Sequence, residues 1–598
     1  MKSVTRTPIE LSQRAPDGAT ASREAQTNGS LGEVDDTMLR SLARAAQRLS
    51  MRRPEISVEL CVLLTCMFFA VISSAPFWKA LLADRRWADA STWTFAAPVF
   101  IAITLLHFAV LAAVCNRWTA KPILAVLLLV NACAMPFMQD YGVYLDPTMV
   151  RNIVRTDVGE AGEYLSVTGL MRVALYGGVP AAVLLTLRFS RRPLARAAVV
   201  RCVLIAGAVL GSLLALALVM KDFAPLMRAH KQMRYLITPG NYLYSMTRVL
   251  TGTIRGEAPA RTHLVGTDRH TASAAIADKP VLFVMIVGET ARGDNFSLNG
   301  YARDTNPRLS NLDIVNFPDV TSCGTATEVS LPCMFSPFGR DRYDEDTTRN
   351  HDGLLNVLAH AGYRVLWRDN NSGCKGTCEG DGIALQTASQ LSSVECPSGR
   401  CLDEVLLRNL NVVASTGAEN VFLVLHQLGN HGPAYYQRYP PTFRRFTPTC
   451  DTVELRKCTQ EQLVNTYDNA ILYTDHLLGE VIAFLSERAD QYRTAMLYVG
   501  DHGESLGEGG VYLHGLPYAI APHVQTHVPM LMWMSESFRE DFKVNSQCIR
   551  AQATRAASHD NVFHSIVGLL AIETSEYRAD SDLFESCVRH ALRAAGRT

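Results

Sequence analysis

The sequence lacks an excess of charge of either sign: its 598 residues include 57 Lys and Arg and 57 Asp and Glu, for a formal net charge of 0. This balance argues against a nucleic-acid-binding chain, which needs a basic surface to bind phosphates. We expect no cleavable signal peptide. Residues 1–53 also lack an apolar run that could form a core, and we interpret them as a disordered cytoplasmic tail.

Charged residues are almost absent from five apolar segments, each close to the ~20 residues that cross a bilayer core. Five such stretches argue against a chain that is soluble throughout, because buried helices of soluble proteins rarely repeat this pattern. We therefore expect a transmembrane domain over 54–220. Its five helices should lie near residues 56–75, 95–114, 122–138, 170–187 and 199–220.

Basic residues gather in alternate connections between these segments. Arg52 and Arg53 precede the first, Arg117 and Lys121 separate the second from the third, and several arginines follow the fourth. These connections should face the cytoplasm. An odd number of spans then places everything after Met220 outside the cytoplasm. That part should divide into a bridging segment, a soluble domain and a tail, at residues 221–279, 280–575 and 576–598.

Ten of the fifteen cysteines fall in the part expected outside the cytoplasm. Eight of them form four close pairs in polar surroundings, which is typical of disulfides in an oxidising compartment. The pairs have irregular spacings, which argues against zinc fingers. Eight cysteines permit many connectivities, and the state of Cys548 and Cys587 stays open. We favour pairing of sequence neighbours: Cys323 with Cys333, Cys374 with Cys378, Cys396 with Cys401, and Cys450 with Cys458.

Short apolar runs alternate with helical stretches after residue 280. Runs such as 281–287 and 495–499 are typical of strands buried in a parallel sheet. The alternation predicts a doubly wound α/β domain, whose site should lie beyond the carboxyl ends of its strands. Glu289 follows the first run, and Asp501 and His502 follow the other. Two strands would thus deliver carboxylate and imidazole groups to one rim.

A loop of small polar residues at 322–336 lies between those two strands in sequence and leads into an expected helix. The start of a helix presents free N–H groups to an anion. A hydroxyl placed there can attack phosphorus if a metal makes it an alkoxide. Thr325, Thr327 and Ser330 are all candidates by spacing alone.

Five motifs of this chain resemble those of the phosphoethanolamine transferases that act on lipid A, which include the mobile colistin-resistance enzymes. The resemblance extends from the first apolar segment to about residue 570. It implies a five-helix transmembrane domain followed by an alkaline-phosphatase-like (sulfatase-like) α/β domain with a mainly parallel central sheet. The motifs are GETAR (288–292), SCGTATEVSLPCMFS (322–336), DNNSGCKG (369–376), GNHGPAYYQRYP (429–440), and GDHGESLGE (500–508) followed by YLHG (512–515).

The resemblance also implies roles for individual residues. Thr327 would be the nucleophile and accept the phosphoethanolamine group covalently. Zinc would be held by Glu289, Asp501, His502 and the oxygen of Thr327, a ligand set that suits an open catalytic site. For histidines outside the motifs we expect structural roles. The residues that would bind phosphate, or hold a second zinc, are Ser372, Lys375, His431 and His514.

The outward loop between the third and fourth apolar segments carries Asn152, Thr156 and Glu160. They recur every four residues, so on a helix they would share one face. In the resembling family these positions contact the ethanolamine headgroup of the donor lipid, and the resemblance therefore implies a binding role here.

The function implied by the resemblance is transfer of phosphoethanolamine from phosphatidylethanolamine to a phosphate of lipid A, through a phosphothreonine. This would lower the negative surface charge and give polymyxin resistance. The enzyme would be a multi-pass protein of the bacterial inner membrane, in contact with membrane lipids, monomeric, and with its catalytic domain in the periplasm.

Two alternatives stay open, and a third is disfavoured. The acceptor could be a core sugar or another periplasmic glycan. The enzyme could be a metal-dependent hydrolase of the phosphatase or sulfatase type, although the loop at 322–336 lacks the C-x-P-x-R-like context of a sulfatase. A transporter is disfavoured, because the apolar segments contain no paired ionisable residues.

Overall fold

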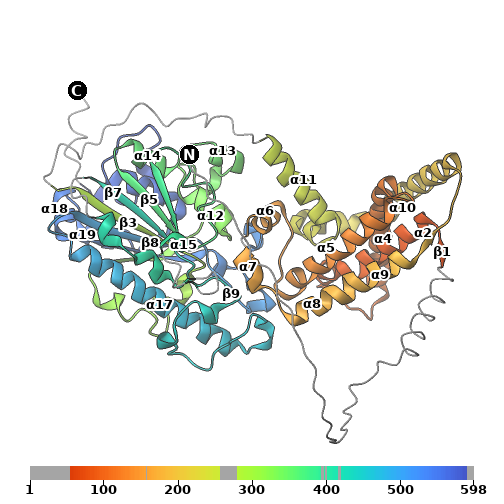
Figure 1. Cartoon of the computed structure of the whole chain (residues 1–598), viewed down its shortest axis with the longest axis horizontal. Helices are drawn as coiled ribbons and strands as arrows, with labels where there is room; N and C mark the ends of the chain where they lie inside the picture. Colours follow the sequence, from red (N-terminus) through yellow and green to blue (C-terminus); the bar gives the residue numbers. More distant parts are fainter. Residues whose placement is uncertain are drawn as a thin grey trace, which may run out of the picture. The chain divides into compact units, whose positions relative to one another are not determined.

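The computed structural model describes residues 54–156, 158–255, 279–391, 396, 401–414 and 419–588 (Figure 1). The tail expected over 1–53 lies outside the described residues. The chain divides into two compact units. Among described residues the smaller unit contains 54–55 and 186–188, where the N–H of Arg188 donates to the carbonyl of Pro54 at 3.0 Å. The larger unit holds the remaining described residues, including the sheet and the candidate site.

Four helical segments are long and apolar enough to cross a membrane. A fifth candidate consists of α2 (Val58–Phe68), a π-helical turn (Phe69–Ser73) and α3 (Ala75–Leu81), which together are bent by 58°. The bend has local causes, a π turn and Pro76 in the first turn of α3. The described chain thus has four candidate spans, or five if the bent pair is one span. The four are α4 (Ala90–Val114), α5 (Ala120–Asp140), α8 to α9 (Val167–Thr186) and α10 (Leu194–Ala229).

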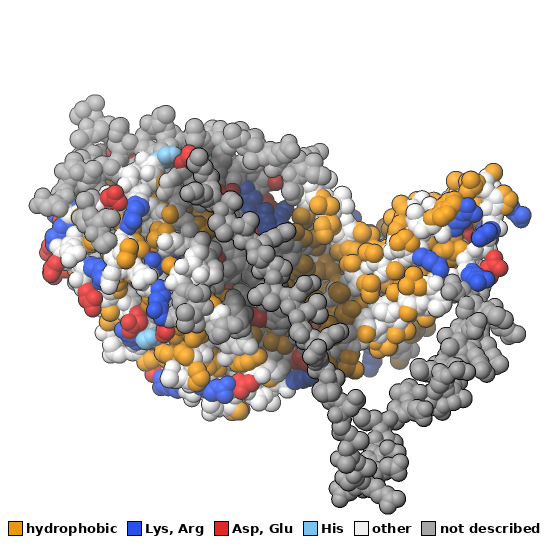
Figure 2. Space-filling model, viewed as in Figure 1, with side chains coloured by type: hydrophobic (Ala, Val, Ile, Leu, Met, Phe, Trp, Pro, Cys, Tyr) orange, Lys and Arg blue, Asp and Glu red, His pale blue; other side chains and the backbone are white. Residues whose placement is uncertain are grey.

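Apolar side chains cover the outer surface of these helices (Figure 2). Leu218 on α10 is 80% exposed, and Leu106 on α4 is 54% exposed. Side chains of this kind are stable in that position when lipid rather than water surrounds them. The surface of the helices therefore agrees with the membrane domain expected from the sequence.

Helix α10 is longer than the apolar segment expected at 199–220. Its 36 residues span about 54 Å at 1.5 Å per residue, which exceeds the ~30 Å bilayer core. The helix continues past Met220 to Ala229, with Pro225 inside it. The expected bridging segment therefore starts as helix, and then forms a 3₁₀ turn at Lys231–Leu236 and α11 (Gly240–Arg255).

The outward loop forms two short helices instead of one. These are α6 (Pro147–Arg155) and α7 (Val158–Glu163), and Thr156 between them has an extended backbone with φ −64° and ψ 132°. The prediction that Asn152, Thr156 and Glu160 share one helix face is therefore wrong. The Thr156 hydroxyl donates to the carbonyl of Asn152 at 2.8 Å, a local bond that competes with continuation of the helix.

An eight-stranded sheet forms the centre of the soluble domain, in the order β12-β4-β11-β8-β3-β7-β5-β6. β11 is antiparallel to both neighbours, and all other pairs are parallel. The strands are β3 (Val281–Gly288), β4 (Val315–Thr321), β5 (Arg364–Asp369), β6 (Ile383–Thr387), β7 (Val421–His426), β8 (Arg493–Gly500), β11 (His527–Met534) and β12 (Ala557–Ser558).

Helices cover both faces of this sheet, as the α/β prediction requires. Every residue of β3 is buried, and its side chains alternate between two cores. Figure 1 shows α14 and α17 on opposite faces. The helices are α12 (Thr327–Met334), α13 (Glu345–Arg349), α14 (Leu354–His360), α15 (Ala388–Leu391), α16 (Leu410–Val413), α17 (Gln460–Ser486), α18 (Glu536–Asp541), α19 (Ser546–Gln552) and α20 (Val562–Leu569).

Disulfides join the neighbouring cysteines of the soluble domain: Cys323–Cys333, Cys374–Cys378, Cys396–Cys401 and Cys450–Cys458. A fifth joins Cys548 to Cys587 across 39 positions. Cys587 and Phe584 are also buried in the core. The packed chain therefore continues beyond residue 575, where the sequence analysis placed the start of a tail, because a long-range disulfide holds this segment against α19.

We expect the double variant Cys548→Ser/Cys587→Ser to lose about 2–4 kcal/mol of stability, because the disulfide restricts a long loop in the unfolded chain. The measurement is the thermal unfolding midpoint of the detergent-solubilised protein without reductant. Cys133→Ser is the matched control, since Cys133 is exposed and free. Equal midpoints for the double variant and the control would contradict the expectation.

Candidate active site

Two adjacent strands bring their following residues to the same edge of the sheet. β3 and β8 pair in parallel with Gly288 opposite Gly500, so Glu289 and Asp501 both leave the sheet at its carboxyl edge. Glu289, Asp501 and His502 are completely buried. One ligand atom from each lies within 4.8 Å of the others. The structure thus brings Glu289 together with Asp501 and His502, which lie more than two hundred positions later in the sequence.

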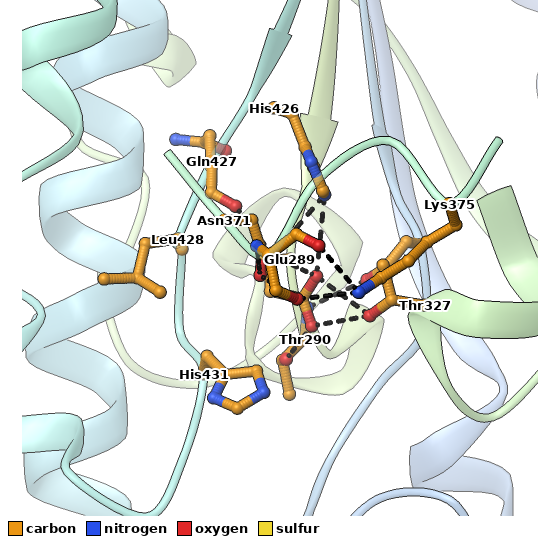
Figure 3. A network of polar contacts seen from close by, with 12 residues as sticks. Glu289, Thr290, Thr327, Asn371, Lys375, His426, Gln427, Leu428 and His431 are labelled. Atoms are coloured by element: carbon orange, nitrogen blue, oxygen red, sulfur yellow. Dashed lines mark hydrogen bonds and ion pairs between the residues drawn. The ribbon is translucent and has the colours of Figure 1, made fainter. Parts of the chain in front are cut away.

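Thr327, the first residue of α12, faces this cluster. Its Oγ1 lies 3.1 Å from both carboxylate oxygens of Glu289 and 3.2 Å from Nε2 of His502. Figure 3 shows Glu289 at the centre of the network, with Thr327 beside it. Ala326, at the N-cap of α12, makes no side-chain capping bond, so the first N–H groups of the helix are available to an anion.

The donor set fits a divalent metal. Oδ1 of Asp501 accepts N–H groups from Thr290 and His502, at 2.9 and 2.7 Å. Its Oδ2 is buried and has no hydrogen-bond partner among the described residues. Nδ1 of His502 donates to the carbonyl of Gly503 at 2.9 Å, which leaves the Nε2 lone pair for the cluster. Carboxylate, imidazole and hydroxyl groups in this arrangement suit zinc.

The electrostatics of these side chains also favour a bound cation. Burial, with the nearby Glu289 carboxylate, raises the pKa of Asp501 to about 7. Burial alone would lower the pKa of His502, but the carboxylates of Asp501 and Glu289 outweigh it and raise that pKa to about 10. Two buried carboxylates therefore require positive charge beside them, which a cation would provide.

A second layer of side chains orients Glu289, and the sequence analysis missed it. Nδ1 of His426 lies 2.7 Å from Oδ1 of Asp369, and its Nε2 lies 3.8 Å from Oε2 of Glu289. Asn371 donates to the same Oε2 at 2.6 Å. Asp369 and His426 are the last residues of β5 and β7. The sequence could have predicted both residues, because polar residues at the carboxyl ends of buried parallel strands line the site.

Asp369→Asn should weaken metal binding by roughly 10–100-fold, the usual effect of losing a group that orients a ligand. The substitution keeps the side-chain size but removes the charge that holds His426, so Glu289 loses part of its support. Zinc titration against a competing chelator measures the change. Asp381→Asn is the matched control, because Asp381 is exposed. Unchanged affinity in Asp369→Asn would show that this layer does not position Glu289.

Two further histidines lie beside His502. The rings of His514 and His502 have centroids 4.4 Å apart, and those of His431 and His514 are 5.2 Å apart. Burial lowers the pKa of both His431 and His514 to about 3, so each presents a neutral imidazole. Oε2 of Glu504 lies 2.8 Å from Nδ1 of His514. Glu504 was missed as a site residue although it belongs to the GDHGESLGE motif.

Ser372 and Lys375 lie on the loop after β5. Nζ of Lys375 donates to Oγ of Ser372 at 2.7 Å and to its carbonyl at 3.0 Å. The backbone of Lys375 has φ +52°, a left-handed turn that costs energy for a residue with a Cβ. In Figure 3 its side chain extends toward Thr327 and Glu289. This places an ammonium group next to the nucleophile candidate.

Residues of the outward loop reach the same region. Oε1 of Glu160 on α7 lies 3.5 Å from Nε2 of His431, and Glu160 is 8% exposed. Asn152 lies on α6, where its carbonyl accepts the Thr156 hydroxyl. The three residues expected to bind the donor headgroup therefore lie on different elements: Asn152 on α6, Thr156 between the helices, and Glu160 on α7. Of these, Glu160 lies beside His431, a predicted site residue.

An ion-pair network connects α6 to the helix of Thr327. Glu328, the next residue, is 1% exposed, and its Oε1 accepts from Arg155 of α6 and, at 2.6 Å, from Arg349 of α13. Arg349 also donates to the carbonyl of Lys375 at 2.6 Å. Arg151 of α6 pairs with Glu345 of α13. The sequence offered no signal for the pairs made by Arg151 and Arg155, because their partners lie about 170 to 190 positions away along the chain.

Comparison with known proteins agrees with this geometry. The family model described as phosphoethanolamine transferase EptA/EptB matches residues 103–254, and the sulfatase model matches residues 282–572. Phosphoethanolamine transferase EptA of Escherichia coli (strain K12) is 39% identical over 552 residues, which cover 90% of this chain and 98% of that protein. Phosphatidylethanolamine transferase Mcr-1 of Escherichia coli is 38% identical over 425 residues, covering 70% and 79%.

A solved structure extends the match to both domains. The integral membrane protein lipooligosaccharide phosphoethanolamine transferase A (EptA) from Neisseria meningitidis superposes with a TM-score of 0.84 at 33% identity, covering 90% of this chain and 100% of that one. The family suggested by the five motifs is thereby confirmed. The chain belongs to the lipid A phosphoethanolamine transferase family, as an integral membrane enzyme whose helical domain precedes a sulfatase-like α/β domain.

Proposed function

We propose that this enzyme transfers phosphoethanolamine from phosphatidylethanolamine to a phosphate of lipid A, through a covalent phosphothreonine at Thr327. The observation that carries the proposal is the position of the Thr327 hydroxyl, 3.1 Å from the carboxylate of Glu289 and 3.2 Å from Nε2 of His502. A hydroxyl buried among metal-ligand side chains at a helix start is suited to attack phosphorus.

The first step exchanges one phosphorus–oxygen bond for another. Oγ1 of Thr327 bonds to phosphorus while the bond from phosphorus to the diacylglycerol oxygen breaks. Thr327 gives up its hydroxyl proton, and diacylglycerol leaves as an alcohol after gaining one. Lys375, with Ser372, would bind the phosphoryl oxygens, and so would the neutral imidazoles of His431 and His514.

The second step regenerates the enzyme. An oxygen of a lipid A phosphate forms a bond to phosphorus as the bond to Oγ1 of Thr327 breaks. The acceptor phosphate loses a proton, and Thr327 regains one. The lipid A phosphate attacks at the same site from which diacylglycerol has left. The residues that bind the phosphoryl oxygens therefore act in both steps.

Glu289, Asp501, His502 and Oγ1 of Thr327 are the residues that would hold zinc. When bound there, zinc would lower the pKa of the Thr327 hydroxyl and offset negative charge on the phosphoryl oxygens. Asn371, His426 and Asp369 keep Glu289 in position. His431 and His514, whose imidazoles are neutral and adjacent, are the candidates for a second ion.

The donor lipid is proposed to enter beside α7. Glu160 is a residue of that helix, and its carboxylate lies 3.5 Å from His431. A carboxylate there suits an ethanolamine ammonium. Disulfides in the soluble domain and basic residues in the alternate connections support placement of this domain in the periplasm and of the helices in the bacterial inner membrane.

Lipid mass spectrometry tests the acceptor. A host without its own lipid A phosphoethanolamine transferase, expressing this chain, should carry phosphoethanolamine on lipid A and survive higher polymyxin concentrations than the empty host. Phosphoethanolamine on core sugars with unmodified lipid A would replace the proposed acceptor with a core glycan. Diacylglycerol release with free phosphoethanolamine and no acceptor product would identify a hydrolase instead.

A further inference from the structure

A second group of metal-ligand side chains lies apart from the one around Glu289. Asp294 belongs to a 3₁₀ turn at Gly293–Asn295, His523 begins another at His523–Gln525, and His527 is the first residue of β11. One ligand atom from each lies within 4.8 Å of the others. The two histidines are four positions apart, a spacing found in zinc sites.

The distances approach those of a bound ion. Oδ2 of Asp294 lies 3.1 Å from Nδ1 of His527 and 3.7 Å from Nδ1 of His523. Zinc binds such atoms at ~2.0–2.1 Å in a tetrahedron, which sets neighbouring ligands about 3.3 Å apart. Each pair with Asp294 is thus within a few tenths of an ångström of the spacing that zinc requires.

The orientation of His527 is held by a backbone carbonyl. Its Nε2 lies 2.8 Å from the oxygen of Pro318, which accepts the Nε2 proton and leaves Nδ1 as the ligand atom facing Asp294. This is the usual support of a metal-binding histidine. Gly293 lets the backbone approach the ring, because a Cβ there would lie 2.8 Å from Cε1 of His527.

The group is open to solvent on one side. The side chain of His527 is 12% exposed, that of Asp294 is 37% exposed, and that of His523 is 69% exposed. An ion can therefore enter without unfolding, and a water can complete its coordination. Arg292, which precedes the turn that holds Asp294, is paired with Glu508 at 2.8 Å.

We propose that Asp294, His523 and His527 form a zinc site separate from the one at Glu289, with water as the fourth ligand. The proposal does not depend on the proposed acceptor or on the phosphothreonine. None of the five sequence motifs contains these three residues, and the sequence analysis assigned such histidines a structural role.

At this location a bound zinc ion would have a structural role. The N–H groups of Gly503 and Glu504 donate to the carbonyls of Gln525 and Val524, at 3.0 and 2.9 Å. The segment between the two histidines is therefore bonded to the residues that follow His502. Asp294 follows the strand that delivers Glu289. A zinc ion here would crosslink the turn that holds Asp294 to the segment from His523 to His527. It would thereby stabilise the edge of the sheet that carries the candidate active site.

Metal titration of the full-length protein in detergent tests the site. After removal of metals with a chelator and exchange into chelator-free buffer, Zn²⁺ is titrated and bound metal is counted. The single variant Glu289→Gln removes the other cluster as a contributor. We expect Glu289→Gln to bind one more equivalent than Glu289→Gln/His523→Ala/His527→Asn, and zinc to raise the thermal unfolding midpoint further when both histidines are present than when they are replaced. Bound Co²⁺ should show the visible absorption of a tetrahedral site.

His476→Ala in the same Glu289→Gln background is the control, because His476 is a partly exposed histidine that faces Glu404 elsewhere on the domain. It should bind as much zinc as its parent. Unfolding midpoints in excess chelator show whether each variant is folded, and Asp294→Asn replaces the double histidine variant if that one is not. Equal zinc stoichiometry with and without His523 and His527 would overturn the proposal and reduce the group to an Asp294–His527 ion pair.

Discussion

Thr327→Ala is expected to transfer phosphoethanolamine at least about a thousand-fold more slowly than the wild-type enzyme, because loss of the proposed covalent nucleophile would remove the reaction path itself. The residue is buried against Glu289 and His502, where water cannot take its place without losing the alignment that the start of α12 provides. Rates are measured with phosphatidylethanolamine and purified lipid A in detergent.

Two variants separate the nucleophile from its surroundings. Thr327→Ser keeps a hydroxyl and should retain part of the activity. Thr325→Val is the matched control, since the Thr325 hydroxyl donates to the carbonyl of Leu516 at 2.6 Å and not to Glu289 or His502. Acid-quenched wild-type enzyme should carry phosphoethanolamine on the peptide that contains Thr327. Full lipid modification by Thr327→Ala would reject this residue as the nucleophile.

Exhaustive chelation of the wild-type enzyme should reduce transfer by at least about a hundred-fold, and added zinc should restore it. Without a cation, the buried carboxylates of Glu289 and Asp501 repel each other and the incoming phosphate. Asp501→Asn removes the ligand oxygen that has no hydrogen-bond partner among the described residues, so this variant should need a much higher zinc concentration for recovery.

The control for that experiment is Asp490→Asn, which changes an exposed aspartate after α17 and should recover like the wild type. Metal content is measured beside activity, so that loss of zinc and loss of transfer can be compared in each variant. Transfer that persists after chelation has emptied the Glu289 cluster would exclude a catalytic metal.

Several features of the fold follow from local patterns in the chain. The uniformly apolar runs at 281–287 and 495–499 predicted buried parallel strands, and β3 and β8 occupy them. Placement of Glu289 and Asp501 at one edge then follows from the general rule for parallel sheets. The apolar segments likewise predicted the membrane helices, because a bilayer core sets a minimum helix length.

Features that depend on the ends of elements were predicted less well. The four-residue spacing of Asn152, Thr156 and Glu160 predicted one helix. The structure instead ends α6 at Arg155, and the backbone of Thr156 is extended. α10 continues to Ala229, since apolar composition marks the bilayer core and not the end of a helix. The domain boundary expected at residue 575 was also too early, because the disulfide from Cys587 to Cys548 is a tertiary contact.

The sequence by itself determined the order of the domains, the strands of the α/β domain and, through its motifs, the family of the enzyme, since these depend on residues close together in the chain. Only the tertiary structure decided that Asp369 and His426 support Glu289, that Arg155 reaches Glu328, and that Asp294 meets two histidines. The physical reason is that strand register and helix packing set distances between side chains from remote segments, and neither can be read from spacing along the chain.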